Sequence, residues 1–275
     1  MIPQAFVNAW AQVAPWADPN QVEQDLVLGR LIVEIASHPQ LTDELVFRGG
    51  TCLHKLHLPN PLRYSEDLDY VRATHGPIGP VLDALRDIAA ELGMDVATDV
   101  SQFPKCFYRS TFESGGGRLQ VKVEINTYET SPARPHLRVP FAIESPWWSG
   151  RADILTFEPA ELVATKLRAL YQRRKGRDLF DLWLALTRMG VEPSEIIECF
   201  APYRPDSYTS EAAIANLRGH LADELFRDDL APLLAPIEPG TLGVATLGGP
   251  DSSAIADYDV DGAADLVIAE LLSVL

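Results

Sequence analysis

The segment RYSEDLDYV, residues 63–71, carries two aspartates, Asp67 and Asp69, that are separated by one leucine. If this segment is a β-strand, both carboxylates lie on one face of it, because alternate side chains of a strand share a face. Two neighbouring carboxylates repel each other and are stabilised by a hard divalent cation such as Mg²⁺, which also binds substrate phosphates. The spacing therefore indicates a metal site, with an exposed strand end that carries solvated acids as the structural alternative.

Two further features suggest phosphate chemistry. The residues RGGT, 48–51, stand where a predicted strand passes into a helix, so the backbone N–H groups of Gly49 and Gly50 and the Thr51 hydroxyl could bind an anion. A Gly-Gly pair can also be only a tight turn. Glu124 supplies a third carboxylate on the polar face of another predicted strand, which could equally be the open side of a sheet. Three acids beside a phosphate site predict two-metal phosphoryl transfer.

Apolar spacing and chain breakers predict the elements that must position these residues. Strands are expected in ELVFRGG, in DLDYV and in the pair KCFYRSTF and RLQVKVEIN, which the glycine turn ESGGG joins. In the last strand, apolar residues from Leu119 to Ile125 alternate with polar ones. Helices are expected in TCLHKLHL, PAELVATKLRALYQ and DLFDLWLALTRMG and over residues 3–13, 20–36, 78–92, 194–200, 210–225 and 262–274.

The order of these elements predicts an α+β protein in two lobes. The proline-rich stretch 131–150 is the expected boundary between them, and the glycine and proline cluster 236–250 is expected to be a loop. The first lobe, residues 1–150, would hold the sheet and the N-terminal helices. The second, residues 151–275, would be mostly α-helical.

Composition excludes several classes of protein. The formal net charge of −16 argues against a protein that coats nucleic acid non-specifically, since that binding draws on clustered Lys and Arg. No apolar run approaches the roughly 20 residues that span a bilayer, and the N-terminus lacks a signal-peptide pattern, so we expect a cytoplasmic protein with no membrane partner. The three cysteines, Cys52, Cys106 and Cys199, are widely separated and are expected to be reduced and buried.

One segment departs from this acidic background. Residues 166–177 contain no acid, which suggests a specific anion there, with a solvated helix face as the alternative. Its basic residues are Lys166, Arg168, Arg173, Arg174, Lys175 and Arg177. These six residues are called the basic cluster below.

The motifs together resemble a known family. FRGGTCLHKLHL and RYSEDLDYV resemble the first two motifs of the AbiEii/AbiGii nucleotidyltransferase toxins, which belong to the DNA polymerase β-like nucleotidyltransferase superfamily. ELVATKLRALYQRRKGRDLFDLW resembles the lysine and Arg-Asp motifs that follow in that family. The resemblance covers roughly residues 45–185, and its specificity comes from the order and combination of the motifs. It implies a polymerase β-like nucleotidyltransferase lobe with a mixed sheet, followed by a helical lobe that carries the Lys and Arg-Asp motifs.

The resemblance also implies roles for individual residues. A nucleoside triphosphate (NTP) would be held by Gly49, Gly50 and Thr51. Arg63 and Ser65 would position the acidic strand or the triphosphate, unless they form only a surface salt bridge. Asp67, Asp69 and, on strand pattern and chain order, Glu124 would bind Mg²⁺ or Mn²⁺. Lys166 would reach the phosphates and Asp178 would be the acid of the last motif; alternatively, Asp178 caps a helix with Asp181 as its capping partner.

The implied function is that of a toxin in a toxin–antitoxin or abortive-infection system. It would transfer a nucleoside monophosphate from an NTP to an RNA acceptor, most concretely a tRNA 3′ end lying across the basic cluster, and a cognate antitoxin would neutralise it. One alternative is an inactive binding module with the same fold. Another is a haloacid-dehalogenase-type phosphatase, because DLDYV also fits the Asp-x-Asp start of that class, although no apolar run precedes Asp67.

Overall fold

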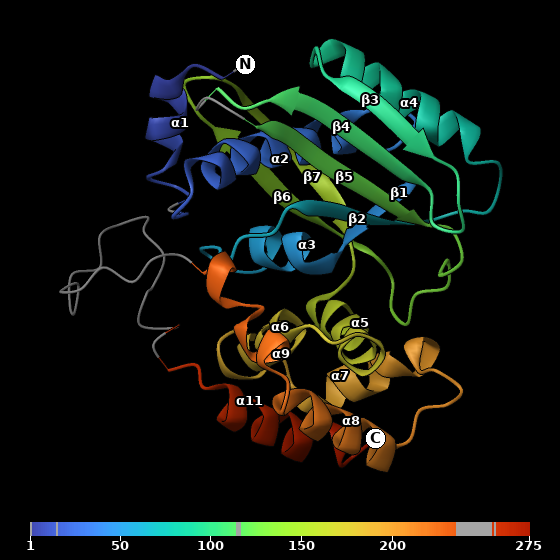
Figure 1. Ribbon diagram of the computed structural model, residues 1–275. Coiled ribbons are helices and arrows are strands. Elements are labelled where there is room, and N and C mark those ends of the chain that lie inside the picture. Colours follow the sequence, from blue (N-terminus) through green and yellow to red (C-terminus); the bar gives the residue numbers. More distant parts are fainter. Residues whose placement is uncertain (1, 15, 114–116, 235–254, 256) are drawn as a thin grey trace. The chain divides into compact units, whose positions relative to one another are not determined.

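The computed structural model describes residues 2–14, 16–113, 117–234, 255 and 257–275 (Figure 1). Contacts within the chain divide these residues into two compact units. The first unit holds the described residues of 1–130 and 136–157. The second holds residues 131–135, 158–234 and the described part of 251–275.

The first unit is built on a mixed seven-stranded sheet with the strand order β3-β4-β5-β2-β1-β7-β6. Within it, β2 is antiparallel to β1 but parallel to β5, and β1 is parallel to β7. The strands are β1 (Leu45–Arg48), β2 (Asp67–Arg72), β3 (Asp95–Asp99), β4 (Lys105–Thr111), β5 (Arg118–Asn126), β6 (Leu137–Glu144) and β7 (Ser149–Thr156).

The helices of the first unit are α1 (Gln4–Trp10), α2 (Pro19–Ser37), α3 (Gly49–Leu56) and α4 (Gly79–Glu91). Three of them, α2, α3 and α4, pack on the sheet, and α1 packs on α2. In β5, Val121, Val123 and Ile125 are fully buried while Gln120 is exposed, so the predicted alternation is confirmed. The Tyr108 hydroxyl of β4 donates to the Leu85 carbonyl of α4 (2.7 Å), which ties that helix to the apolar face.

The described elements of the second unit are helical. Its core includes Leu179, Phe180, Leu182 and Leu184 of α6, none of which is exposed. The helices are α5 (Pro159–Gln172), α6 (Gly176–Thr187), α7 (Pro193–Phe200), η1 (Ala201–Tyr203), α8 (Ser210–Leu221), α9 (Glu224–Asp228), η2 (Ala231–Leu233), α11 (Val260–Val267) and η3 (Ile268–Leu272).

The α+β prediction is confirmed, with two differences in the sheet. The stretch predicted as a lobe boundary contains β6 and the start of β7, which form an antiparallel hairpin. Pro140 lies inside β6, where an edge strand tolerates it because one side of that strand needs no backbone donor. Strand β3 was also not predicted. The loop expected over 236–250 and residues 114–116 of the expected glycine turn lie outside the described residues.

Other predictions about the chain can be set against the structure. Cys52, Cys106 and Cys199 are buried free thiols, as expected. Within the described ranges, none of the helices combines the length and apolar character that crossing a membrane requires. The functional division into a nucleotidyltransferase lobe and a lobe with the Lys and Arg-Asp motifs stays a prediction.

Candidate active site

The three predicted metal-binding carboxylates meet on one face of the sheet. Asp67 and Asp69 lie on β2, and the parallel register between β2 and β5 sets Asp69 opposite Glu124 and Asp67 opposite Lys122. Neighbouring strands are about 4.8 Å apart, so a register pair brings its side chains together. Glu124, on the polar face of β5, therefore lies beside the two aspartates of β2.

Lys122 lies among these carboxylates and was not assigned a role from the sequence. Its Nζ is 3.0 Å from Asp67 Oδ2 and 3.4 Å from Glu124 Oε2. Burial works against the lysine charge, but Asp67 and Glu124 outweigh it and raise the Lys122 pKa. The alternation in RLQVKVEIN puts Lys122 and Glu124 on the same face, so this lysine was detectable in the sequence.

Burial makes both aspartates harder to ionise. It raises the pKa of Asp67 despite the opposing charge of Lys122, and it raises the pKa of Asp69 despite Arg48. The repulsion between the carboxylates adds to both shifts. A cation bound between them would relieve this cost, as expected for metal ligands.

The donor chemistry at this site fits a hard divalent cation. All three candidate ligands present carboxylate oxygens, which Mg²⁺ and Mn²⁺ prefer, and the Lys122 ammonium already stands between two of them as a positive charge. In the part of the chain that is described, no group of three or more His, Cys, Asp and Glu side chains is arranged to hold a metal ion. Coordination by all three acids thus requires their side chains and Lys122 to rearrange.

The glycine turn packs directly against the carboxylates. Gly49 has φ +85°, and a Cβ added to it would lie 2.3 Å from Asp69 Oδ2. A Cβ on Gly50 would lie 2.4 Å from Nη2 of Arg63. Both glycines are therefore required for close approach, and the turn reaches the acid of β2 on one side and the Arg63 guanidinium on the other.

The turn also opens helix α3. Its first residues are Gly49, Gly50 and Thr51, and the N-cap residue Arg48 makes no side-chain capping bond. The first N–H groups of a helix have no intrahelical acceptor and lie at the positive end of its dipole. Backbone donors next to a carboxylate pair suit a metal-bound phosphate.

Thr51, Ser65 and Arg63 connect the turn to the acidic strand. The buried Thr51 hydroxyl lies 2.8 Å from Ser65 Oγ and also contacts the Asp67 carbonyl. Arg63 is only 2% exposed, and its Nη1 donates to the Tyr64 carbonyl (3.2 Å), so the surface salt-bridge alternative for Arg63 is wrong. The structure thus brings the residues of the first two motifs together in the first unit.

The residues of the later motifs form a cluster of their own in the second unit. Lys166 Nζ lies 2.8 Å from Asp181 Oδ2 and 3.3 Å from Asp178 Oδ1. Arg173 donates to both carboxylate oxygens of Asp178, through Nε to Oδ2 (2.6 Å) and Nη2 to Oδ1 (2.8 Å). Lys166 is 5% exposed and both aspartates are fully buried.

This cluster replaces the capping alternative for Asp178. The N-cap of α6 is Lys175, and Asp178 lies in the first turn of the helix. Burial would raise the Asp178 pKa, but Lys166 and Arg173 outweigh it and hold the pKa below its ordinary value. Asp178 is therefore a charged member of a buried ion-pair cluster, and the sequence did not reveal its partner Arg173.

Most of the basic cluster is paired with acids from later in the second unit. Arg174 contacts Asp223 at 3.1 Å, and Lys175 contacts Asp229 at 3.2 Å. Arg177 lies 3.8 Å from the same Asp229. The absence of acids between residues 166 and 177 therefore does not produce an unpaired basic surface.

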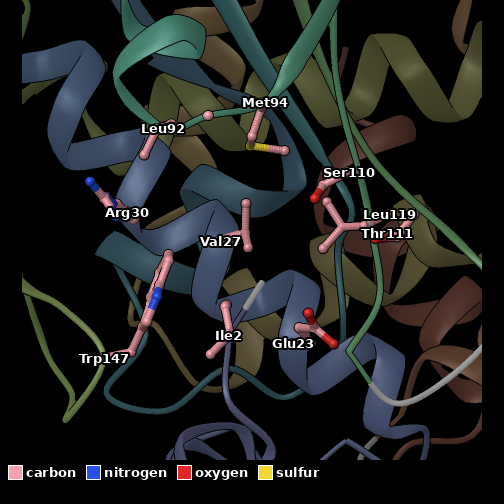
Figure 2. Close-up of a pocket in the computed structure, with 11 residues that line it drawn as sticks. Ile2, Glu23, Val27, Arg30, Leu92, Met94, Ser110, Thr111, Leu119 and Trp147 are labelled. Atoms are coloured by element: carbon pink, nitrogen blue, oxygen red, sulfur yellow. The ribbon is translucent and has the colours of Figure 1, made fainter.

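A small cavity of about 50 Å³ occupies another part of the first unit (Figure 2). Val27 and Arg30 of α2 border it together with Met94 and Trp147. Glu23, which also lines it, accepts two hydrogen bonds from the Glu113 amide (3.0 and 3.2 Å). None of the predicted site residues lines this cavity, so we assign it no role in the chemistry.

Comparison with known proteins identifies the family. The family described as "Nucleotidyl transferase AbiEii toxin, Type IV TA system" matches residues 30–257. The chain belongs to this AbiEii nucleotidyltransferase toxin family. The match includes all four predicted motifs, and membership implies a cognate antitoxin. No functionally curated protein sequence matches the chain.

Solved structures support the AbiEii assignment at the level of fold. The chain is similar to MenT4, a nucleotidyltransferase toxin from Mycobacterium tuberculosis H37Rv, with a TM-score of 0.57 and 19% identity over 100% of this chain and 99% of that one. It is also similar to JHP933 from Helicobacter pylori, with a TM-score of 0.51 and 15% identity over 93% and 91% of the two chains. The predicted nucleotidyltransferase fold is thereby confirmed.

Replacing Gly49 with alanine should damage both stability and the carboxylate site. The positive φ costs about 1–2 kcal/mol for a residue with a Cβ, and the added methyl group displaces the Asp69 carboxylate. We expect a lower urea unfolding midpoint and loss of Mg²⁺-dependent NTP binding. Gly79→Ala is the matched control, because a Cβ there meets nothing within 4 Å. Equal behaviour of the two variants would contradict the close packing of the turn.

Lys166→Ala should lower the free energy of unfolding by about 3–5 kcal/mol, because it leaves two buried aspartates without this counter-ion. Lys166→Gln/Asp181→Asn removes one charge of each sign and leaves Asp178 paired with Arg173, so it should be less destabilising than Lys166→Ala. Urea unfolding of both variants measures this. A Lys166→Ala variant as stable as the wild type would contradict the ion-pair cluster. If the double variant folds but loses transfer, the lysine charge is needed in the chemistry.

Proposed function

We propose that this AbiEii toxin transfers a nucleoside monophosphate from an NTP to an RNA acceptor in a metal-dependent reaction. The observation that carries the proposal is the contact between the glycine turn at the start of α3 and the Asp69 carboxylate, beside Glu124 on the adjacent strand. There, the backbone N–H groups that could bind a phosphate lie next to the carboxylate of Asp69. Family membership supports the transferase chemistry.

The residues of the first unit have separate roles in the proposed reaction. Bound Mg²⁺ or Mn²⁺ would activate the attacking hydroxyl and neutralise the leaving pyrophosphate. Asp67 and Asp69 would hold the metal, with Glu124 as the third acid, and the backbone amides of the glycine turn would hold the triphosphate. Arg63 and the hydrogen-bonded pair of Thr51 and Ser65 fix the turn against β2.

The phosphate contact that the resemblance assigns to Lys166 and the acidic role it assigns to Asp178 stay predictions. Within the second unit their contacts define a positioning role, since the ion-pair cluster joins α5 to α6. The variants described above separate a structural from a chemical requirement for the lysine.

Two alternatives from the sequence fare differently. The phosphatase alternative requires the aspartates at the carboxyl end of a parallel strand, whereas Asp67 is the first residue of β2. The geometry and the family both reject it. An inactive binding module would show no metal-dependent NTP binding; the intact glycine turn and carboxylate pair favour an active enzyme over such a module.

The most concrete acceptor is the 3′ end of a tRNA in the cytoplasm, where a cognate antitoxin would control the toxin. The ion pairs of the basic cluster weaken the reason for placing RNA there, because a phosphate backbone would have to displace Asp223 and Asp229. Incubating the protein with total RNA and each labelled NTP identifies both substrates. Absence of label transfer to any RNA would contradict this acceptor class.

Asp67→Asn and Asp69→Asn should each reduce transfer by about two orders of magnitude or more, the size of effect seen when a preorganised electrostatic group is removed. Neither should destabilise the fold. Because the folded-state pKa of each aspartate is raised, its ionised form opposes folding at neutral pH, and a neutral amide removes that cost. Transfer assays and thermal melting measure the two effects, with Asp95→Asn on the exposed end of β3 as the control. Normal transfer by both site variants would end the two-metal proposal.

As the pH is lowered, metal binding should weaken at a higher pH than it would if the two aspartates had ordinary pKa values. The metal competes with protons for Asp67 and Asp69, and their raised pKa values move that competition above the ordinary aspartate value of about 3.9. Calorimetric titration with Mn²⁺ over a series of pH values, in the absence of nucleotide, measures it. A binding constant that falls only near the ordinary aspartate pKa contradicts the burial argument.

A further inference from the structure

A groove of about 410 Å³ runs along the sheet face next to the carboxylates. Asp67 and Lys122 line it where it meets the candidate active site, and Arg118 and Gln120 continue it along β5. Arg118 is four residues from Lys122, which is about 13 Å along a strand. The volume is within the range of roughly 300–1,000 Å³ that holds small organic groups.

The order of the strands gives this groove a direction relative to the triphosphate. In the sheet, β1 lies on one side of β2 and β5 and β4 lie on the other (Figure 1). The glycine turn follows β1, whereas residues of β5 and β4 line the groove. An in-line displacement at phosphorus needs the attacking hydroxyl and the leaving pyrophosphate on opposite sides of the transferred group. With the triphosphate at the turn, the attacking substrate must approach from the side of β5.

The lining of the groove fits a single-stranded nucleic acid. Phe107 of β4, which stands opposite Lys122 in the register, and Phe112 have half-buried aromatic rings. The Arg109 guanidinium lies over the Phe107 ring, 5.6 Å from its centroid, so a cation already accompanies this aromatic side chain.

The lining also includes one exposed acid, Glu66, at the end next to Asp67. Arg118 is exposed and makes no ion pair with any residue that the structure describes. Aromatic rings that stack on bases, alternating with cations that contact phosphates, are the features by which proteins bind unpaired strands.

We propose that this groove binds the single-stranded 3′ end of the RNA acceptor, with bases stacked on Phe107 and Phe112 and a backbone phosphate at Arg118. The inference rests on the proposed function, since it places the acceptor hydroxyl next to Asp67. It assigns the acceptor to the first unit and not to the basic cluster of the second.

The test uses the full-length protein and a short, fluorescently labelled single-stranded oligoribonucleotide with a free 3′ hydroxyl. Phe107→Ala should weaken oligonucleotide binding by about tenfold or more, the size of one lost stacking contact. Arg118→Ala should weaken it and reduce its dependence on salt, since one phosphate contact is lost. Phe141→Ala and Arg151→Ala, on the β6–β7 hairpin of the same sheet, are matched controls that should bind as the wild type does. Mg²⁺-dependent NTP affinity should stay unchanged in all four variants.

Phe107→Leu keeps apolar volume without an aromatic ring, so it separates loss of stacking from loss of folding; it should behave like Phe107→Ala in binding and like the wild type in thermal melting. Wild-type oligonucleotide affinity in Phe107→Leu and Arg118→Ala would overturn the proposal. So would loss of NTP affinity with oligonucleotide binding retained, which would place the nucleotide base in the groove. A wild-type protein that binds the oligonucleotide through these residues but transfers nothing contradicts the proposed function and leaves the groove assignment standing.

Discussion

The parallel pairing of β2 with β5 is the constraint on which the candidate active site depends. It brings Asp69 level with Glu124 and Asp67 level with Lys122, although the two strands are far apart in the sequence. The antiparallel pairing of β2 with β1 then brings Arg48, and with it the glycine turn, to Asp69 on the other side. A one-residue slip of β2 against β5 would send the carboxylates to the apolar face of the sheet, and a slip of β1 against β2 would move the glycine turn away from Asp69.

The ionic cluster around Asp178 and the one around β2 differ in how completely they are neutralised. In the second unit, the buried acids Asp178 and Asp181 are matched by Lys166 and Arg173, and the Asp178 pKa is lowered. Around β2 the opposite holds, because the aspartate pKa values are raised in spite of nearby cations. The acids of the second unit are thus neutralised by their own cations. The carboxylates around β2 would be stabilised by further positive charge. This contrast supports the proposal that the carboxylates of β2 bind a cation.

Local patterns in the sequence predicted the elements that carry the site but not all of their connections. Alternation in DLDYV and RLQVKVEIN correctly predicted which side chains share a face, because a strand has a period of two whatever its partners are. The pairing of those strands is non-local, so strand pattern and chain order suggested that Glu124 joins the aspartates but did not give the direction or register of the pairing. The hairpin of β6 and β7 was missed because Pro140 and its neighbouring prolines resemble a linker. A proline is tolerated in a strand at the edge of a sheet, but which strand lies at the edge depends on the whole sheet and cannot be read from a local segment.

The same limit applies to the basic cluster. Within residues 166–177 there is no acid, but Asp223 and Asp229 lie more than forty positions further along and return to pair with it. A count of charges over a short window cannot include such partners. In a protein with a net charge of −16, long-range attraction of a polyanion is weak, so the proposed RNA acceptor would be held mainly by short-range contacts. Stacking on aromatic side chains is such a contact. The proposal therefore places the 3′ end at Phe107 and Phe112, which line the same groove as Asp67. The basic cluster is less suited to this role because acids of the same chain already pair with most of its residues.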